Sequence, residues 1–343
     1  MACFIVAEAG VNHNGSLESA LRLVDAAADA GADAVKFQTF SADRLVSASA
    51  PKAEYQARET GGGSQHAMLK ALELSPSDHV ALGTRCAERG IEFMSTPFDE
   101  EAADFLVSIG MRRIKVPSGE LTNPRLLRHV ARFDVPLIVS TGMADLAEVQ
   151  EAVAWIEDAR RGAGAVAALA DRVTLLHCTS NYPATPADVN LTAMRSMATA
   201  TRLPVGYSDH TSGIEVALAA VALGACVIEK HFTLDRSLPG PDHRASLEPA
   251  ELAKMVSGIR AVEAALGDGV KRPQASELAV RDVARRSVIL AADRPAGHVL
   301  RRDDLALLRP GNGIPPKSLD AVVGRRLARA VGAGSALQWD DLA

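Results

Sequence analysis

Short apolar runs alternate with longer amphipathic segments along the first 270 residues of the chain. The runs have the length and composition of buried strands. The segments between them carry apolar residues at helical spacing, as Leu17, Leu21 and Val24 do after the first run. Eight strands are predicted in this way, over residues 4–8, 34–38, 91–97, 112–120, 136–142, 173–179, 203–211 and 226–233.

Polar residues with helix-capping chemistry mark where several of the amphipathic segments begin. Asp145 is followed by Glu148 three positions later, which is the pattern of a capping box. The last segment has Pro249 in a first-turn position. Helices are therefore expected to start at Ser16, near Asp99, near Asn123, at Asp145 and near Ser246.

The order of these elements predicts the fold. Strands that alternate with helices form a parallel sheet, and eight such units in about 270 residues have the number and size of a (β/α)8 TIM barrel. An open, doubly wound sheet is the competing arrangement, but no GxGxxG motif follows the first strand. The expected fold class is α/β, with a catalytic barrel over residues 1–270.

Two stretches depart from this rhythm. Residues 39–75 form a long connection, which in a compact domain is usually functional or mobile. Three glycines at 61–63 favour flexibility, and we expect a lid over the strand ends. Residues 271–286 are polar and basic and are predicted to form a linker. Residues 287–343 then carry short apolar runs between Gly and Pro turns, which predicts a small β-rich domain with a modest core.

Composition narrows the classes of function. The 343 residues are 48% hydrophobic and 23% charged, as in ordinary globular domains. An aromatic content of 4% and a net charge of −5 argue against a nucleic-acid-binding protein. No apolar run approaches the roughly 18 residues that cross a membrane, and no signal-peptide pattern is present. The four widely spaced cysteines are expected to be small buried side chains in a cytoplasmic protein.

Charge is divided unevenly along the chain. Residues 271–343 hold 13 Lys and Arg against 8 Asp and Glu, a net charge of +5, whereas residues 1–270 have a net charge of −10. The basic C-terminal part and the acidic main body are expected to attract each other, within one chain or between chains.

Polar side chains stand at the carboxyl ends of the predicted strands, where a TIM barrel carries its active site. Lys36 and Lys115 lie inside otherwise apolar strands, and a buried unpaired lysine is costly. Each lysine either pairs with a carboxylate or faces an anionic ligand. Hydroxyl groups end four of the strands, at Ser118, Ser140, Ser180 and Ser208. Singly they can cap turns or helices, but with the lysines they suit a phosphate and a carboxylate on one small molecule.

Two histidines, His210 and His231, end neighbouring strands. Neutral imidazoles in such positions can share one divalent metal ion, with water or substrate completing the shell. An open site of this kind acts as a Lewis acid on a carbonyl group. His177 lies deeper in its strand and is interpreted as structural. His13 either caps the first helix or lines the mouth, and Asp242, in the turn PGPD, either serves the turn or faces the mouth.

Ten motifs run in order through nearly the whole chain: IVAEAGVNHNG, AVKFQTF, STPFDEEA, IKVPSGELTN, VSTGMA, HCTSNYP, GYSDHT, EKHFT, PGPDHRASLEP and LRPGNGI. The set resembles the sialic acid synthase family, the phosphoenolpyruvate-dependent nonulosonate synthases, and the C-terminal part resembles their antifreeze-like (SAF) domain. The resemblance implies a homodimer with swapped C-terminal domains, each covering the partner's barrel. It also implies that phosphoenolpyruvate condenses with an N-acylated mannose-type sugar, that phosphate is released, and that Mn²⁺ or Mg²⁺ is required.

The resemblance also implies roles for individual residues. The phosphoenolpyruvate contacts would be Lys36, Thr96, Lys115, Ser118, Ser140 and Ser208. The metal ligands would be His210 and His231, and the sugar contacts would be Glu8, Gln38, Tyr182 and Asp242. Glu120 or Glu8 would transfer protons, and Arg309 would reach the sugar site of the partner subunit. Ser180 stands where some members carry Asn and can still bond the ligand.

Members of this family use different acceptor sugars. The segment DHRAS after PGP is closer to neuraminate and legionaminate synthases than to pseudaminate synthases. The expected acceptor is therefore N-acetylmannosamine or 2,4-diacetamido-2,4,6-trideoxymannose. Two other functions stay open. A Schiff-base aldolase would use Lys36, Lys115 or Lys230, whereas a non-enzymatic carbohydrate-binding protein would need neither a metal pair nor buried lysines.

Overall fold

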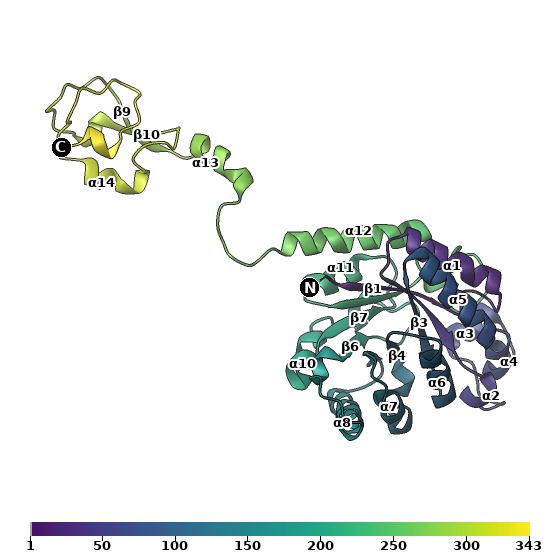
Figure 1. Ribbon diagram of the computed structural model, residues 1–343. Helices are drawn as coiled ribbons and strands as arrows, with labels where there is room; N and C mark the ends of the chain where they lie inside the picture. The colour runs from purple at the N-terminus through teal and green to yellow at the C-terminus, as the bar shows by residue number, and fades with distance from the viewer. Residues whose placement is uncertain (1) are drawn as a thin grey trace. The chain divides into compact units, whose positions relative to one another are not determined.

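The computed structural model describes residues 2–343, and they fall into two compact units (Figure 1). The first unit ends at Gly267 and contains the barrel strands, and the second unit is Asp268–Ala343. The segment predicted as a linker belongs to the second unit and holds a short helix, α13 (Leu278–Ala284).

Eight parallel strands form the sheet of the first unit, which confirms the predicted α/β barrel. The order in the sheet is β3-β2-β1-β8-β7-β6-β5-β4, and the two end strands, β3 and β4, pack side by side and close it. The strands are β1 (Phe4–Gly10), β2 (Ala34–Thr39), β3 (Glu92–Pro97), β4 (Ile114–Val116), β5 (Leu137–Ser140), β6 (Val173–Cys178), β7 (Val205–Asp209) and β8 (Val227–His231).

Helices follow every strand of the barrel and surround it (Figure 1). They return the chain to the start of the next parallel strand, which such a topology requires. The helices are α1 (Leu17–Asp29), α2 (Ala42–Leu45), α3 (Glu54–Thr60), α4 (Gln65–Lys70), α5 (Pro76–Arg89), α6 (Glu100–Ser108), α7 (Pro124–Ala131), α8 (Leu146–Gly162), α9 (Pro186–Val189), α10 (Ala193–Thr201), α11 (Glu215–Ala222) and α12 (Pro249–Leu266).

Side-chain caps start four helices at the predicted residues. Each capping oxygen accepts a hydrogen bond from the backbone N–H three positions later, which satisfies a donor that has no partner within the helix. Before α8 the carboxylate of Glu148 also accepts from the backbone N–H of Asp145, so the predicted capping box is formed. The four caps are Ser16, Asp99, Asn123 and Asp145.

The last helix of the barrel starts later than predicted. α12 begins at Pro249, with Glu248 as its N-cap. Ser246 has an extended backbone, and its hydroxyl donates to the carbonyl oxygen of Asp242 (2.7 Å) and accepts from the side-chain amide of Asn12 (2.9 Å). Ser246 therefore ties the turn after β8 to the loop after β1 instead of capping the helix.

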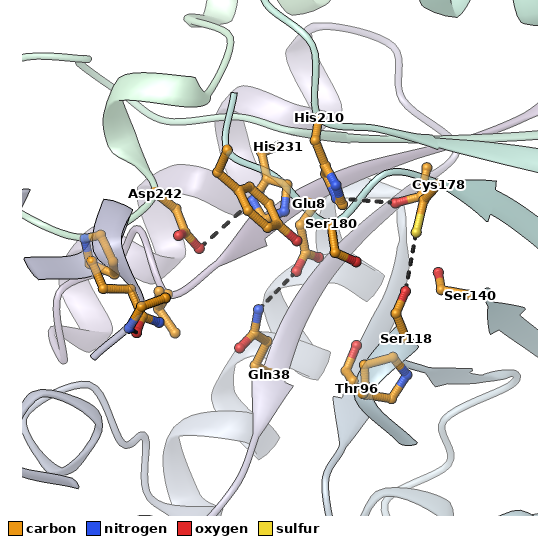
Figure 2. A pocket seen from close by; sticks show the side chains of 18 of the residues that line it. Glu8, Gln38, Thr96, Ser118, Ser140, Cys178, Ser180, His210, His231 and Asp242 are labelled. Atoms are coloured by element: carbon orange, nitrogen blue, oxygen red, sulfur yellow. Dashed lines mark hydrogen bonds and ion pairs between the residues drawn. The ribbon is translucent and has the colours of Figure 1, made fainter. Parts of the chain in front are cut away.

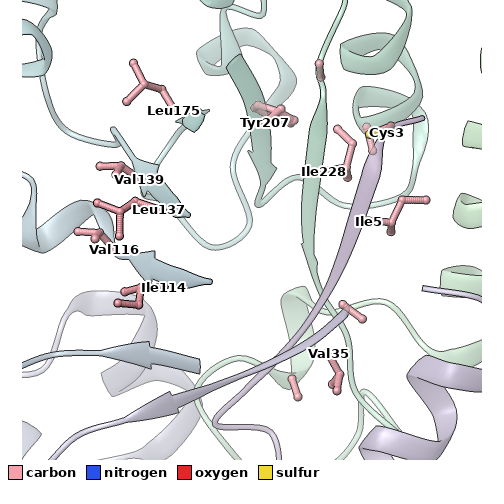
Figure 3. Close-up of a cluster of buried hydrophobic side chains, with 14 of the residues drawn as sticks. Cys3, Ile5, Val35, Ile114, Val116, Leu137, Val139, Leu175, Tyr207 and Ile228 are labelled. Atoms are coloured by element: carbon pink, nitrogen blue, oxygen red, sulfur yellow. The ribbon is translucent and has the colours of Figure 1, made fainter. Parts of the chain in front are cut away.

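Side chains along each strand alternate between the inside of the barrel and the surrounding helices. Outward-facing residues such as Ile5, Val35 and Ile228 belong to the large core between sheet and helices (Figure 3). Inward-facing residues form a smaller apolar layer made of Val6, Ala34, Met94, Ile138, Leu176 and Val227. Gly206 is needed beside this layer because a Cβ there would lie 2.7 Å from Leu176 Cδ2.

The long connection after β2 is folded into short helices, α2 to α4, and is not an open loop. Lys52 Nζ donates to Thr60 Oγ1 (2.8 Å) and to the carbonyl oxygens of the next two glycines (3.1 Å each). Leu72 is buried with Val11 and Phe40 in a small apolar cluster. The hydrogen bonds of Lys52 hold the connection together, and the packing of Leu72 on Val11 attaches it to the barrel. Its movement as a lid stays a prediction.

Two expectations from composition can be compared with the structure. Cys3, Cys86 and Cys178 are buried as expected, Cys226 is partly exposed, and all four are free thiols. Among residues 2–343 there is no helix with the length and apolar character that a membrane span requires.

The second unit has a small core of its own, as the predicted β-rich domain requires. Its strands β9 (Ser287–Leu290) and β10 (Leu305–Leu308) pair antiparallel, isolated bridges link further segments, and a short helix, α14 (Leu319–Val322), follows. The core residues are Val288, Leu290, Leu300, Ile314, Val322, Leu327, Val331, Leu337 and Leu342.

One buried carboxylate, that of Asp304, joins three parts of the second unit. It accepts hydrogen bonds from His298 Nε2 (2.9 Å), the backbone N–H of Arg301 (2.9 Å) and Arg294 Nη2 (2.6 Å). These bonds hold the pKa of Asp304 well below its usual range. Because the folded-state pKa is depressed, the stabilisation is present above the unfolded-state pKa and is lost as the pH falls below it.

We expect Asp304→Asn to destabilise the second unit by about 2 kcal/mol, because charge-assisted hydrogen bonds are replaced by weaker ones. Hydrogen exchange of the full chain, followed by mass spectrometry, should show faster exchange in residues 287–343 and unchanged exchange in the barrel. Asp320→Asn is the matched control, since Asp320 pairs with Arg302 but is 87% exposed. Equal protection of the second unit in both variants would contradict the role of Asp304.

Candidate active site

A cavity of about 490 Å³ opens at the carboxyl ends of the barrel strands (Figure 2). Strand residues form its floor, and residues of the 39–75 connection and of the turn after β8 form part of its walls. The predicted site residues that line it are Glu8, Lys36, Gln38, Thr96, Lys115, Ser118, Ser140, Ser180, Tyr182, Ser208, His210, His231 and Asp242.

Strand geometry explains why these residues meet. In β8, Val227 belongs to the apolar layer inside the barrel, and Glu229 and His231 follow on the same face at two-residue spacing. In β2, Ala34 of the apolar layer is likewise followed by Lys36. The inside of the barrel is therefore apolar toward the amino ends of the strands and polar toward their carboxyl ends, where the cavity lies.

The two buried lysines are balanced by two carboxylates. Lys36 Nζ lies 2.6 Å from Glu8 Oε2 and 3.7 Å from Glu229 Oε2, and it donates to Thr96 Oγ1 (2.9 Å). Lys115 Nζ lies 3.4 Å from Glu229 Oε1. All four charged side chains are almost fully buried. Pairing with carboxylates is thus present for both lysines, and both also line the cavity.

The same contacts separate the acidities of the two carboxylates. Burial alone would raise the pKa of Glu229, but Lys115 and Lys36 lower it to about 2. Burial raises the pKa of Glu8 to about 7 against the opposing effect of Lys36. Burial lowers the pKa of Lys115, whereas Glu229 and Glu8 more than offset burial at Lys36 and raise its pKa. The carboxylate of Glu229 therefore stays ionised, and that of Glu8 can exchange a proton near neutral pH.

Two serine hydroxyl groups and a thiol, all from residues that line the cavity, pack closely against Gly142. Its backbone N–H donates to Ser118 Oγ (3.0 Å), which lies 3.1 Å from Cys178 Sγ. A Cβ at Gly142 would lie 2.8 Å from Ser118 Oγ and 2.7 Å from Cys178 Sγ, and it would collide with Ser180 Oγ. Ser140 Oγ is buried and has no hydrogen-bond partner within residues 2–343. These donors, near two ammonium groups, suit an oxyanion.

His210 and His231 lie side by side, with ring centroids 5.5 Å apart. His210 Nδ1 donates to the carbonyl oxygen of Thr179 (2.7 Å), which leaves the lone pair on Nε2, 3.5 Å from Ser208 Oγ. His231 Nδ1 is buried without a hydrogen-bond partner in the described chain and lies 3.9 Å from Asp242 Oδ2. Burial lowers the pKa of both imidazoles, so both are neutral at neutral pH.

This histidine pair fits a divalent cation because neutral imidazoles with free lone pairs are common metal ligands. Within residues 2–343, no group of three or more His, Cys, Asp or Glu side chains is arranged to hold a metal ion. Any further ligands of a cation between His210 and His231 would therefore come from substrate and water.

Aromatic rings and a carboxylate complete the wall beside the histidines. The Tyr182 ring centroid lies 4.1 Å from that of His210 and 5.5 Å from that of His231, and Tyr55 of α3 stacks on Tyr182 at 5.1 Å. Asp242 faces the cavity, which answers the question left open by its turn motif. Burial raises the pKa of Asp242 to about 6.

One predicted site residue of the barrel, Glu120, is not part of the cavity lining. Glu120 follows the lining residue Gly119, and its carboxylate accepts a hydrogen bond from the side-chain amide of Asn123 (2.7 Å) at the start of α7. Arg309 belongs to the second unit. The roles of Glu120 in proton transfer and of Arg309 in sugar binding stay predictions.

Three further candidates take part in local hydrogen bonds instead. His177 Nε2 donates to the carbonyl oxygen of Val189 (2.6 Å), as its interpretation as a structural residue requires. His13 accepts a hydrogen bond from a backbone N–H two residues later, in the turn before α1. Lys230 Nζ lies 2.8 Å from Asp209 Oδ2 on the outer face of the strands.

The predicted site left out two residues that line the cavity, Glu229 and Cys178. A signal existed for Glu229, because two-residue spacing places it on the same face as His231 and places Lys230 on the opposite face. Cys178 is two positions before Ser180 but was interpreted only as an apolar residue.

The chain is similar to known proteins over nearly its whole length. Residues 23–271 match the NeuB family, and residues 285–343 match the SAF domain. The chain is 52% identical to N,N'-diacetyllegionaminic acid synthase of Legionella pneumophila over 343 residues, which covers 100% of this chain and 95% of the relative. It is 46% identical to the Campylobacter jejuni protein of the same name, with 94% of each chain covered. The crystal structure of N-acetylneuraminic acid (sialic acid) synthetase from Leptospira borgpetersenii, in complex with citrate, matches with a TM-score of 0.71 and 36% identity over 82% of this chain and 90% of that one.

We expect Glu229→Gln to lower the free energy of unfolding of the barrel by about 3 kcal/mol, because it leaves Lys115 without its close carboxylate. Urea unfolding measures this change, with hydrogen exchange of peptides from β4 and β8 as the probe. Glu100→Gln is the control, since Glu100 pairs with Arg125 at the surface and should change stability by less than about 1 kcal/mol. An unfolding midpoint that is the same in both variants would show that Lys115 does not depend on Glu229.

Proposed function

The chain belongs to the NeuB family, and on this basis we propose that it condenses phosphoenolpyruvate with 2,4-diacetamido-2,4,6-trideoxymannose to form a nine-carbon, sialic acid-type sugar. N-Acetylmannosamine is the alternative acceptor. The observation that carries the proposal is the meeting, in one cavity, of two buried lysines, four serine hydroxyl groups and a pair of neutral histidines. The lysines and hydroxyl groups suit the anionic substrate, and the histidines suit a divalent cation that polarises the aldehyde.

The names of the relatives support the choice of acceptor. Two proteins that align over nearly the whole chain are named N,N'-diacetyllegionaminic acid synthases. The condensation adds three carbons, so C2, C4 and C6 of the acceptor become C5, C7 and C9 of the product. A diacetylated, deoxygenated product of this kind therefore needs an acceptor with acetamido groups at C2 and C4 and a methyl group at C6.

The reaction forms one carbon–carbon bond and breaks one carbon–oxygen bond. C3 of phosphoenolpyruvate bonds to the aldehyde carbon of the open-chain sugar, and the aldehyde oxygen takes up a proton. Water adds to C2 of the former phosphoenolpyruvate, and phosphate leaves with its bridging oxygen. Phosphoenolpyruvate, sugar and water thus give the sugar acid and phosphate.

The residues of the cavity can position and stabilise the reactants. Lys36 and Lys115, with the hydroxyl groups beside Gly142, hold the anion close to the aldehyde, which lowers the entropic part of the barrier. Glu8 is suited to transfer the proton because burial brings its pKa to about 7. Bound between His210 and His231, Mn²⁺ or Mg²⁺ would polarise the aldehyde as a Lewis acid.

The proposal includes a cytoplasmic homodimer with swapped C-terminal domains, in which Arg309 contacts the sugar in the partner's cavity. The Schiff-base alternative is less favourable here. Lys36 and Lys115 are each held by carboxylates, and Lys230 is paired with Asp209 on the outer face of the strands. A binding protein without catalysis would have no need of the lysine–carboxylate group.

Phosphate release from phosphoenolpyruvate tests the reaction. We expect release with 2,4-diacetamido-2,4,6-trideoxymannose and Mn²⁺, slower release with N-acetylmannosamine, and no release in EDTA until Mn²⁺ is restored. Activity that persists in EDTA would overturn the role of His210 and His231 as metal ligands. Pyruvate trapped on a lysine by borohydride, without phosphate release, would favour the aldolase.

Arg309→Ala should lower kcat/KM for the sugar by about 10- to 100-fold, as the loss of a charged hydrogen bond predicts, and leave the KM for phosphoenolpyruvate near the wild-type value. Arg302→Ala, in the same unit and paired at the surface with Asp320, is the control.

Mixing Arg309→Ala subunits with inactive Glu8→Gln subunits separates the two possible locations of the arginine. If Arg309 acts in the partner's cavity, random re-pairing should restore about a quarter of the wild-type activity, because half of the dimers then hold one intact site. No restoration in verified mixed dimers would place Arg309 in its own subunit's site.

A further inference from the structure

The cavity has one wall without charged or hydrogen-bonding side chains. We call this surface the apolar wall. It consists of Val11, Met68, Leu69, Leu72 and Phe98, which line the cavity and pack against one another in a separate apolar cluster. The rest of the cavity carries the lysines, carboxylates, hydroxyl groups and histidines described above.

The apolar wall lies outside the level of the reacting groups. Val11 follows the end of β1, Phe98 follows the end of β3, and the other three residues belong to α4 and the turn after it. Lys36 and Lys115, in contrast, lie within their strands. A sugar whose aldehyde lies near the lysines and histidines can therefore reach the wall with its far end, the carbon C6.

Polar groups next to the wall bond to one another. The side-chain amide of Gln65 donates to Gln56 Oε1 (3.3 Å), which also accepts from the backbone N–H of Ala53 (3.1 Å). Thr60 Oγ1 donates to the carbonyl oxygen of Gln56 (2.7 Å) and lies 3.6 Å from Met68 Sδ. A hydroxyl group pressed against Met68 would lose water and would have to compete with these bonds for a partner.

We propose that the apolar wall receives the C6 methyl group of a 6-deoxy acceptor, and that Met68 is a specificity-determining residue against acceptors with a C6 hydroxyl group. This inference rests on the proposed function and deepens it. A methyl group gains by burial against Met68 and Leu72, whereas a hydroxyl group at the same place is desolvated. An apolar pocket rejects an added hydroxyl group by about 100-fold at most, so the expected preference is about 10- to 100-fold.

The acetamido methyl groups at C2 and C4 are competing occupants of the wall. Four acceptors, all with an acetamido group at C2, separate the C4 acetamido group from the C6 methyl group: 2,4-diacetamido-2,4,6-trideoxymannose, 2,4-diacetamido-2,4-dideoxymannose, 2-acetamido-2,6-dideoxymannose and N-acetylmannosamine. The set varies the group at C6 and the group at C4 independently. The quantity to compare is the ratio of kcat/KM for methyl over hydroxymethyl at C6, taken at each C4 substituent.

The experiment compares the wild-type enzyme with Met68→Gln, Met68→Leu and Met143→Gln. Met68 is half-buried, so a side chain of similar length is tolerated there, and Met68→Leu keeps the wall apolar. Met143 lines the same cavity from the loop after β5, outside the apolar wall, and is 75% exposed. It is therefore the matched control for a Met-to-Gln change within the cavity.

We expect a methyl preference of about 10- to 100-fold in the wild type, with either group at C4. Met68→Gln should reduce this ratio at least fivefold, mainly through a gain for the hydroxymethyl acceptors, whereas Met68→Leu and Met143→Gln should keep it. A ratio near one in the wild type, or an equal ratio in wild type and Met68→Gln, would overturn the inference while phosphate release still supports the proposed function. If Met68→Gln instead changes the preference between the two C4 substituents and leaves the C6 preference unchanged, the wall contacts the C4 acetamido group. This result would also overturn the inference. No phosphate release with any of the four acceptors would overturn the proposed function and this inference with it.

Discussion

Two ammonium groups inside a closed barrel are the constraint on which the rest of this site depends. Lys36 and Lys115 are removed from water, and without carboxylates beside them their burial would be too costly for the fold. Glu229 lies close to both lysines, and Glu8 contacts Lys36. Two-residue spacing along parallel strands puts these groups at one level, directly above the apolar layer that fills the barrel.

This arrangement gives the two carboxylates different tasks. Two lysines act on Glu229 and keep its pKa at about 2, so it stays an anion. At Glu8 burial prevails, and its pKa of about 7 allows both protonation states near neutral pH. When Glu8 is protonated, two ammonium groups face a single carboxylate, and the cavity floor has an excess positive charge. An arriving anion is attracted to this charge, and its own negative charge favours the protonated form of Glu8. In the proposed reaction, anion binding and proton supply are therefore coupled by one set of contacts.

Much of the barrel could be predicted because its signals are local. A capping box such as Asp145–Glu148 needs only four residues, and the strand ends identified most of the cavity in advance. The failures concern residues whose role is set by partners far away in the sequence. Glu229 matters because of lysines on β2 and β4, and Ser246 leaves its expected cap because Asn12 and Asp242 engage its hydroxyl group. No pattern within one segment contains that information, although the alternation of β8 could have assigned Glu229 to the inner face.

The division between strands and loops also explains how one chemistry can serve different sugars. The charged floor is fixed by the fold, because changing any of its four groups disturbs the balance of buried charge. The apolar wall comes from α4, the turn after it and the loops after β1 and β3, and its residues pack as a separate apolar cluster. A side chain there can change its size or polarity without altering the lysine–carboxylate contacts. In the proposed function, acceptor choice and bond formation are therefore controlled by different parts of the barrel, and the first can vary while the second is retained.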